Sequence, residues 1–107
     1  MVETRLNDGF VIAGIKGSDR LTAAVADDVK SDLTSIVSES NGKVILDLSN
    51  IKFIDSTGIG VLISALKTAR QSDTSFALCK IQKDVMSLLS LMKLDKIFEI
   101  CSDDSKL

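Results

Sequence analysis

The residues best suited to chemistry in this sequence form one short run, Asp55-Ser56-Thr57-Gly58. The run supplies a carboxylate, two neighbouring hydroxyls and a glycine, immediately before an apolar pattern with helical spacing. At a helix N-terminus the unpaired backbone N–H groups point outwards, and the helix dipole places about half a positive charge there. An oxygen-rich anion attached to Ser56 would meet those N–H groups, because Gly58 removes a side chain that would obstruct them.

A purely structural interpretation of the same residues is also open. Asp, Ser and Thr are the preferred N-cap residues, so spacing alone favours helix capping over chemistry. Asp55 either caps the turn, or orients the Ser56 hydroxyl and adds charge for a partner, and both roles stay open. Asp47, at the end of an apolar run, is predicted to bond local backbone rather than to take part in catalysis.

The composition excludes several other classes of protein. The 107 residues contain no His, no Trp, no Tyr and 4 Phe. Without His there is no Ser-His-Asp or Cys-His catalysis, and the Gly-x-Ser-x-Gly elbow of serine hydrolases is absent, so we expect no enzyme. A receiver-like phosphoacceptor domain would need an acidic pair, which does not precede Lys16-Gly17. Few aromatic residues and a net charge of −2 argue against nucleic-acid binding.

The cysteines and the apolar runs indicate where the protein works. Cys79 and Cys101 lie in apolar runs, and their spacing fits no zinc or redox motif. We predict two small buried thiols, and such low cysteine use fits a reducing compartment. No apolar stretch approaches the ~20 residues that span a bilayer. We therefore expect a cytoplasmic protein with no membrane contact.

Hydrophobic spacing predicts the elements that position the Asp-Ser-Thr-Gly run. An alternating segment and an apolar run flank Asn7-Asp8-Gly9, which predicts an antiparallel hairpin. Helices are predicted over 21–37, 59–69 and 85–92, and further strands over 44–48, 76–79 and 97–100. Since the last three strands alternate with helices, they should run parallel. The predicted fold is an α/β domain with a mixed sheet of about five strands and three to four helices.

Two longer strings in the centre of the chain add a family resemblance. Val44-Ile45-Leu46-Asp47-Leu48-Ser49, a short spacer, and then the segment from Phe53 to Leu62 resemble the signature of the STAS family. The bacterial anti-sigma factor antagonists are the most similar group, and the order of elements matches theirs from residue 2 to about 101. The resemblance implies a single STAS-like domain over 2–101, followed by a polar C-terminal tail over 102–107.

The resemblance also implies a function, which is partner switching. Family antagonists bind an anti-sigma factor that is also a serine kinase, and binding frees a sigma factor. The kinase phosphorylates the first hydroxyl of the motif, here Ser56, with Thr57 as the alternative acceptor. A PP2C-type phosphatase resets the antagonist. ATP and metal belong to those partners, so the resemblance implies no catalytic residue, no cofactor and no metal in this chain, and a monomer or weak dimer. The implied partner-binding residues are Asp19, Arg20, Asp55, Ser56, Thr57, Gly58 and Ile59.

The loop Gly17-Ser18-Asp19-Arg20 departs from the family pattern. In many antagonists a Gly-x-Leu-Asp-like turn follows the second strand and lies near the phosphorylated serine. Aligned on Gly17, this chain has Asp19 at the Leu position and Arg20 at the Asp position. Either the partner has a compensating surface or Asp19 takes over the acidic contact. A non-catalytic scaffold subunit of a stress-sensing or lipid-transport complex is the alternative function, although the intact hydroxyl motif favours the antagonist.

Overall fold

A five-stranded mixed sheet organises the molecule, with strands in the order β1-β2-β4-β6-β7. The strands are β1 (Val2–Asn7), β2 (Phe10–Ile15), β4 (Lys43–Asp47), β6 (Ser75–Cys79) and β7 (Glu99–Cys101). β1 pairs antiparallel with β2, and every other neighbouring pair in this sheet is parallel. The computed structural model describes residues 1–101, and the predicted tail over 102–107 lies outside the described residues.

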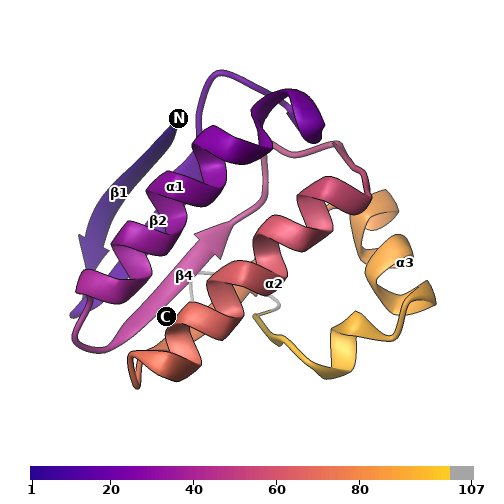
Figure 1. Ribbon diagram of the computed structural model, residues 1–107. Helices are drawn as coiled ribbons and strands as arrows, with labels where there is room; N and C mark the ends of the chain where they lie inside the picture. The colour runs from indigo at the N-terminus through magenta and orange to yellow at the C-terminus, as the bar shows by residue number, and fades with distance from the viewer. Residues whose placement is uncertain (102–107) are drawn as a thin grey trace.

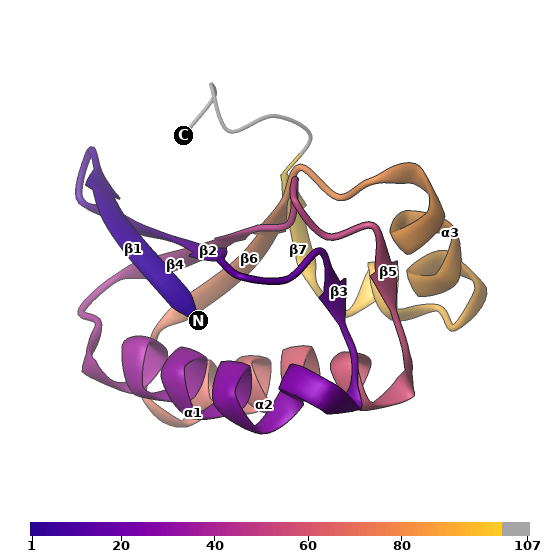
Figure 2. The same cartoon turned by 90° about the horizontal axis from the view of Figure 1, so that it is seen from above.

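Three α-helices accompany the sheet: α1 (Ala23–Glu39), α2 (Ser56–Gln71) and α3 (Lys83–Leu91). α1 and α2 lie side by side on one face of the sheet, while α3 lies beyond its end (Figures 1 and 2). The apolar residues of α1 recur at three- and four-residue steps and are buried against the sheet, as their spacing requires. The predicted α/β fold with a mixed sheet and an N-terminal hairpin is confirmed.

The hairpin turn follows directly from its two central residues. Asp8 and Gly9 have φ angles of 53° and 85°, and the register pairs Asn7 with Phe10. Two consecutive left-handed residues give a tight turn whose twist matches that of the strands, and Asp-Gly adopts it at low cost. The predicted antiparallel hairpin is therefore confirmed.

Two short strands were not predicted. β3 (Arg20–Leu21) and β5 (Phe53–Ile54) pair in parallel and form a separate small sheet. Leu21 lies in β3 and not in the first helix, where its spacing had placed it. The last strand also begins two residues later than predicted, because a 3₁₀ turn, Leu94–Lys96, precedes it and Phe98 packs edge-on against Phe76 from the intervening turn.

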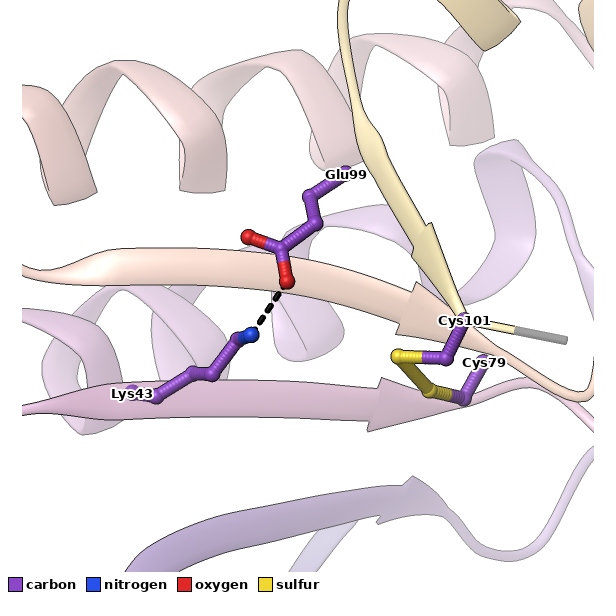
Figure 3. Close-up of a disulfide and its surroundings, with 4 residues drawn as sticks. All are labelled: Lys43, Cys79, Glu99 and Cys101. Atoms are coloured by element: carbon purple, nitrogen blue, oxygen red, sulfur yellow. Dashed lines mark hydrogen bonds and ion pairs between the residues drawn. A yellow bond between two sulfur atoms is a disulfide. The ribbon is translucent and has the colours of Figure 1, made fainter. Parts of the chain in front are cut away.

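The prediction of two buried thiols is wrong, because Cys79 and Cys101 form a disulfide (Figure 3). The two residues are register partners on the parallel strands β6 and β7, with their Cα atoms 4.7 Å apart. Partners directly opposite each other on adjacent strands project to the same face of the sheet. The error arose because the pairing register of distant strands has no signal in the spacing of the cysteines along the chain.

The disulfide lies on the sheet face opposite α1 and α2, within a second and smaller apolar cluster. Ile12, Ile45 and Ala77 are the other buried members of this cluster. At its border the Lys43 ammonium reaches from β4 across β6 to the Glu99 carboxylate on β7 (Figure 3). A covalent link and an ion pair thus both hold the short strand β7 in place.

Candidate functional site

The N-terminus of α2 is held in place by one carboxylate. Asp55 is the N-cap residue, and its Oδ1 accepts a hydrogen bond from the Gly58 backbone N–H at 2.9 Å. Its Oδ2 accepts from the N–H of Ala23, the first residue of α1, at 3.3 Å. One side chain therefore satisfies donors at the starts of two helices, where backbone N–H groups otherwise lack partners. Of the two roles left open for Asp55, capping is the one these contacts support.

Gly58 permits the close approach of α2 to the small sheet. A Cβ at this position would lie 2.7 Å from Ile54 Cγ1 and would overlap the carbonyl oxygen of Leu21. No side chain larger than hydrogen fits there without movement of β3 or α2. The glycine of the motif is therefore required by packing, in addition to its place near the exposed hydroxyls.

The two hydroxyls of the motif remain accessible. Ser56 and Thr57 are both exposed, and within residues 1–101 neither side chain makes a hydrogen bond. The first backbone bond of α2 runs from Ile59 N–H to Asp55 C=O at 2.9 Å, so the N–H groups of Ser56 and Thr57 precede the helical ladder. An exposed hydroxyl beside unpaired N–H groups is a suitable position for a covalently attached anion.

The small sheet brings the loop after β2 to the start of α2. Arg20 pairs with Phe53, and Leu21 pairs with Ile54. The Leu21 carbonyl accepts a hydrogen bond from Asp55 N–H at 3.3 Å, so β3 lies beside the cap itself. The proximity of this loop to the motif, which the family resemblance implied, is therefore confirmed. Figure 2 shows β3 and β5 side by side, between the main sheet and α3.

The outward-facing pair of the small sheet forms a cation–π contact. The Arg20 guanidinium carbon lies 4.5 Å from the centroid of the Phe53 ring. Phe53 is 45% exposed although it is a large apolar residue. Phe53 lies within the string that resembles the family signature, but its role could not be predicted, because a two-residue strand is too short to reveal which of its side chains faces solvent.

The predicted site residues do not all reach the surface. Asp19, Arg20, Ser56 and Thr57 are exposed, and Asp55 is half-buried. The remaining two predicted residues, Gly58 and Ile59, are buried. The four exposed residues come from β3, from the loop before it and from the first turn of α2, which the pairing of β3 with β5 brings to the same part of the molecule.

The structure also bears on Asp47, on metal ligands and on membrane-spanning helices. Asp47 accepts a hydrogen bond from the Ser49 backbone N–H at 2.8 Å, which confirms its predicted bond to local backbone. Over residues 1–101 no cluster of three or more metal-ligating side chains occurs. Within the same residues, no helix has the length and apolar content needed to cross a membrane.

Sequence comparisons find similarity to one protein family and to proteins named as anti-sigma factor antagonists. The family model described as STAS domain matches residues 1–106. The anti-sigma F factor antagonist of Paenibacillus polymyxa is 26% identical over 104 residues, which cover 96% of this chain and 87% of that protein.

Solved structures show the same similarity. The crystal structure of a Thermotoga maritima protein described as an anti-sigma factor antagonist superposes with a TM-score of 0.84 at 28% identity, covering 98% of this chain and 89% of that one. The phosphorylated form of the Bacillus cell fate determinant SpoIIAA superposes with a TM-score of 0.69 at 10% identity, covering 99% of this chain and 96% of that one. At that identity the likeness to SpoIIAA establishes a common fold.

Proposed function

The chain belongs to the STAS domain family, and from this premise we propose that it is an anti-sigma factor antagonist controlled by phosphorylation of Ser56. In its unphosphorylated state it binds an anti-sigma factor with serine kinase activity and so releases a sigma factor. Phosphorylation of Ser56 dissociates that complex, and a PP2C-type phosphatase removes the phosphate so that the protein can bind again. The names of the Paenibacillus and Thermotoga relatives support the antagonist role. On this proposal the chain acts in the cytoplasm as a monomer or weak dimer, without catalysis or cofactor of its own.

The observation that carries the proposal is the exposed Ser56 hydroxyl at the first residue of α2. A kinase must surround a hydroxyl to transfer phosphate to it, and this one has no hydrogen-bond partner to lose among the described residues. Thr57, one residue further into the helix, is the alternative acceptor. The exposed Arg20 pairs with Phe53, three residues before Ser56, so a protein that covers Ser56 would also reach β3 and the loop before it.

Local electrostatics is sufficient for the switch. A phosphate adds about −1.5 to −2 charges and three acceptor oxygens. At a helix N-terminus this charge is favourable, so the fold should survive the modification. Within a packed interface the same group adds bulk and must lose its water. A loss of about 2.7 kcal/mol weakens a complex roughly 100-fold, so no large conformational change is needed.

The proposed contact surface follows the exposure of the predicted residues. Asp19, Arg20, Ser56 and Thr57 would touch the partner directly, with the half-buried Asp55 at their centre. The buried residues Gly58 and Ile59 would act beneath that surface: Gly58 lets the first turn approach β3, and Ile59, 3% exposed, anchors the turn in the core.

The first test is phosphorylation in a purified system. The anti-sigma factors of the source organism that carry a serine kinase domain would each be incubated with this protein, ATP and Mg²⁺. We expect one of them to transfer a single phosphate, which mass spectrometry maps to Ser56. Thr57→Ala should be phosphorylated like the wild type, and Ser56→Ala should not. A stoichiometric phosphate at a site other than these two hydroxyls, or none with any kinase, would contradict the proposal.

The second test is binding by the same variants. Ser56→Ala should bind the kinase persistently in the presence of ATP, whereas Ser56→Asp should bind at least about 10-fold more weakly and keep its melting temperature. Calorimetry without nucleotide measures both. Size-exclusion chromatography of the isolated protein addresses the scaffold alternative, because a large assembly there would favour a scaffold subunit.

A further inference from the structure

We propose that the stacked pair Arg20–Phe53 is the anchor by which this protein recognises its anti-sigma partner, and that the partner presents an acidic side chain to the Arg20 guanidinium. The inference rests on the proposed function and names the chemistry of its central contact. It concerns recognition in the unphosphorylated state, and it assigns a role to Phe53, for which the sequence predicted none.

The exposure of the Phe53 ring is unusual within this protein. Phe76 and Phe98 are 3% and 5% exposed and lie in the main core, whereas Phe53 is 45% exposed. Its neighbour on β5, Ile54, is 3% exposed, so the small sheet places one side chain inward and the next outward. Aromatic rings contribute most to interfaces when a partner completes their burial. Phe53 is therefore in a position to gain burial on association.

The Arg20 guanidinium is restrained by its contact with the Phe53 ring, but no carboxylate among residues 1–101 pairs with it. Its central carbon lies 4.5 Å from the ring centroid. Over residues 1–101 Arg20 forms no ion pair. Within residues 1–101 the guanidinium N–H groups donate no side-chain hydrogen bond, and a guanidinium can bind a carboxylate through two parallel hydrogen bonds. Because the ring already restrains the side chain, less conformational entropy is lost when such a carboxylate binds.

A shallow groove adjoins the ring on the side of α3. It has a volume of about 180 Å³ and is lined by Lys52, Phe53, Ile54, Asp84, Val85 and Leu88. Four of these residues are apolar, and Lys52 and Asp84 are charged. An aromatic ring, an arginine and an adjoining, largely apolar groove form the usual composition of an interface centre.

The direction of the proposed switch favours an acidic contact over a basic one. Ser56 follows Phe53 by three residues, on the same stretch of chain that leaves β5 and enters α2. An acidic group on Arg20 would be repelled by a phosphate on Ser56, so phosphorylation would weaken the complex. A basic group would instead be attracted by the phosphate, and phosphorylation would strengthen the complex. Loss of the partner on phosphorylation therefore favours an acidic group over a basic one at this contact.

The proposal is tested with the purified kinase that phosphorylates Ser56 in the assay above, titrated by calorimetry without nucleotide. Arg20→Glu should weaken binding at least about 100-fold, and Phe53→Ala at least about 30-fold. Arg70→Glu makes the same charge change at an exposed position in the last turn of α2, about 20 Å along the helix from Ser56, and should stay within about twofold of the wild type. The more conservative Phe53→Leu should fall between wild type and Phe53→Ala, and all variants should melt within a few degrees of the wild type.

Salt dependence distinguishes an acidic contact from a loss of packing. Wild-type affinity should fall as NaCl rises from about 50 to 500 mM, and Arg20→Gln should flatten that dependence while Phe53→Ala should not. If Arg20→Glu bound the kinase as tightly as the wild type, or more tightly, the inference would be overturned. The proposed function would still stand in that case, provided that Ser56 is phosphorylated and that its phosphorylation releases the partner. A wild-type protein that binds none of the kinases overturns both. A dimer in solution that Phe53→Ala dissociates would assign the surface to a second copy and overturn the inference as well.

Discussion

The start of α2 and the sheet edge formed by β6 and β7 differ in whether their reactive side chains are bonded to other groups of the protein. At the start of α2 the Ser56 hydroxyl has no hydrogen bond and Arg20 no ion pair within residues 1–101. At the β6–β7 edge the thiols of Cys79 and Cys101 are joined to each other, and the Lys43 ammonium is joined to Glu99 (Figure 3). Only in the second region are these particular groups paired with one another.

This difference shows which region depends on its own cross-links and which is available to a partner. β7 is a three-residue strand at the edge of the sheet, and a short edge strand forms few backbone hydrogen bonds with its neighbour. Its cross-links compensate for that shortage. The start of α2 is held from below instead, by the Asp55 carboxylate and by the close approach of Gly58 to β3. Because those restraints face inward, the outward groups keep their capacity to bind.

Reduction of the disulfide is the largest change that this comparison predicts. The link closes a loop across a sequence separation of 22 residues, and opening such a loop should lower the free energy of unfolding by about 3 kcal/mol. Urea denaturation with and without dithiothreitol measures the loss. Affinity for the anti-sigma kinase should change by less than about twofold, because the disulfide lies outside the small sheet and the first turn of α2.

A double variant provides the control for reduction. Cys79→Ala with Cys101→Ala should unfold at the same urea concentration whether or not dithiothreitol is present. Equal stability of the oxidised and reduced wild type would show that the other contacts of β7 suffice, and the proposed contrast between the two regions would be lost.

Glycine substitutions in the first turns of α2 test the inward restraint there. Gly58→Ala places a Cβ 2.7 Å from Ile54 Cγ1 and should destabilise the fold by about 2 kcal/mol, as overpacked sites do. Gly60→Ala, two residues later, meets no atom within 4 Å and should stabilise the helix by about 0.5–1 kcal/mol. Urea denaturation of the pair measures both. If Gly58→Ala were as stable as Gly60→Ala, packing would not explain the glycine of the motif.

At the opposite edge of the sheet an exposed ion pair joins the N-terminus to α1, and its loss is expected to change stability the least. There the Asp32 carboxylate on α1 accepts hydrogen bonds from the terminal ammonium of Met1 at 3.0 Å and from Val2 N–H at 3.2 Å. The first of these bonds, and then the second, lowers the pKa of Asp32 below its usual 3.8. A depressed pKa in the folded state means that the stabilisation is present above pH 3.8 and is lost as the pH falls through the folded value.

Asp32→Asn should therefore lower the melting temperature by only about 1–2 °C near neutral pH, since the pair is exposed and screened by water. The difference between wild type and variant should shrink as the pH falls below about 4. Thermal melts from pH 3 to pH 7 measure this, with Asp28→Asn on the same helix as control. A difference that grew at acid pH would contradict the assigned sign.

Local patterns predicted the elements and the exposed serine. Asp8-Gly9 predicted the hairpin because the left-handed conformations of its turn are accessible to those two residues. The Asp-Ser-Thr-Gly run predicted a helix entrance because capping depends on residues within one turn of each other. The small sheet of β3 and β5 could not be predicted, since two residues carry no periodicity and their pairing joins segments more than 30 residues apart.

Patterns among near neighbours in the sequence were sufficient to predict the five strands of the main sheet, the three helices and the place of Ser56 at the entrance to α2, but not β3 and β5. The tertiary structure alone decided three contacts: the disulfide between Cys79 and Cys101, the second bond of Asp55 to Ala23, and the stacking of Arg20 on Phe53. Each joins residues at least 22 positions apart. Such contacts depend on which distant strands lie side by side and on how helices pack, and the spacing of residues within one segment carries no information on either.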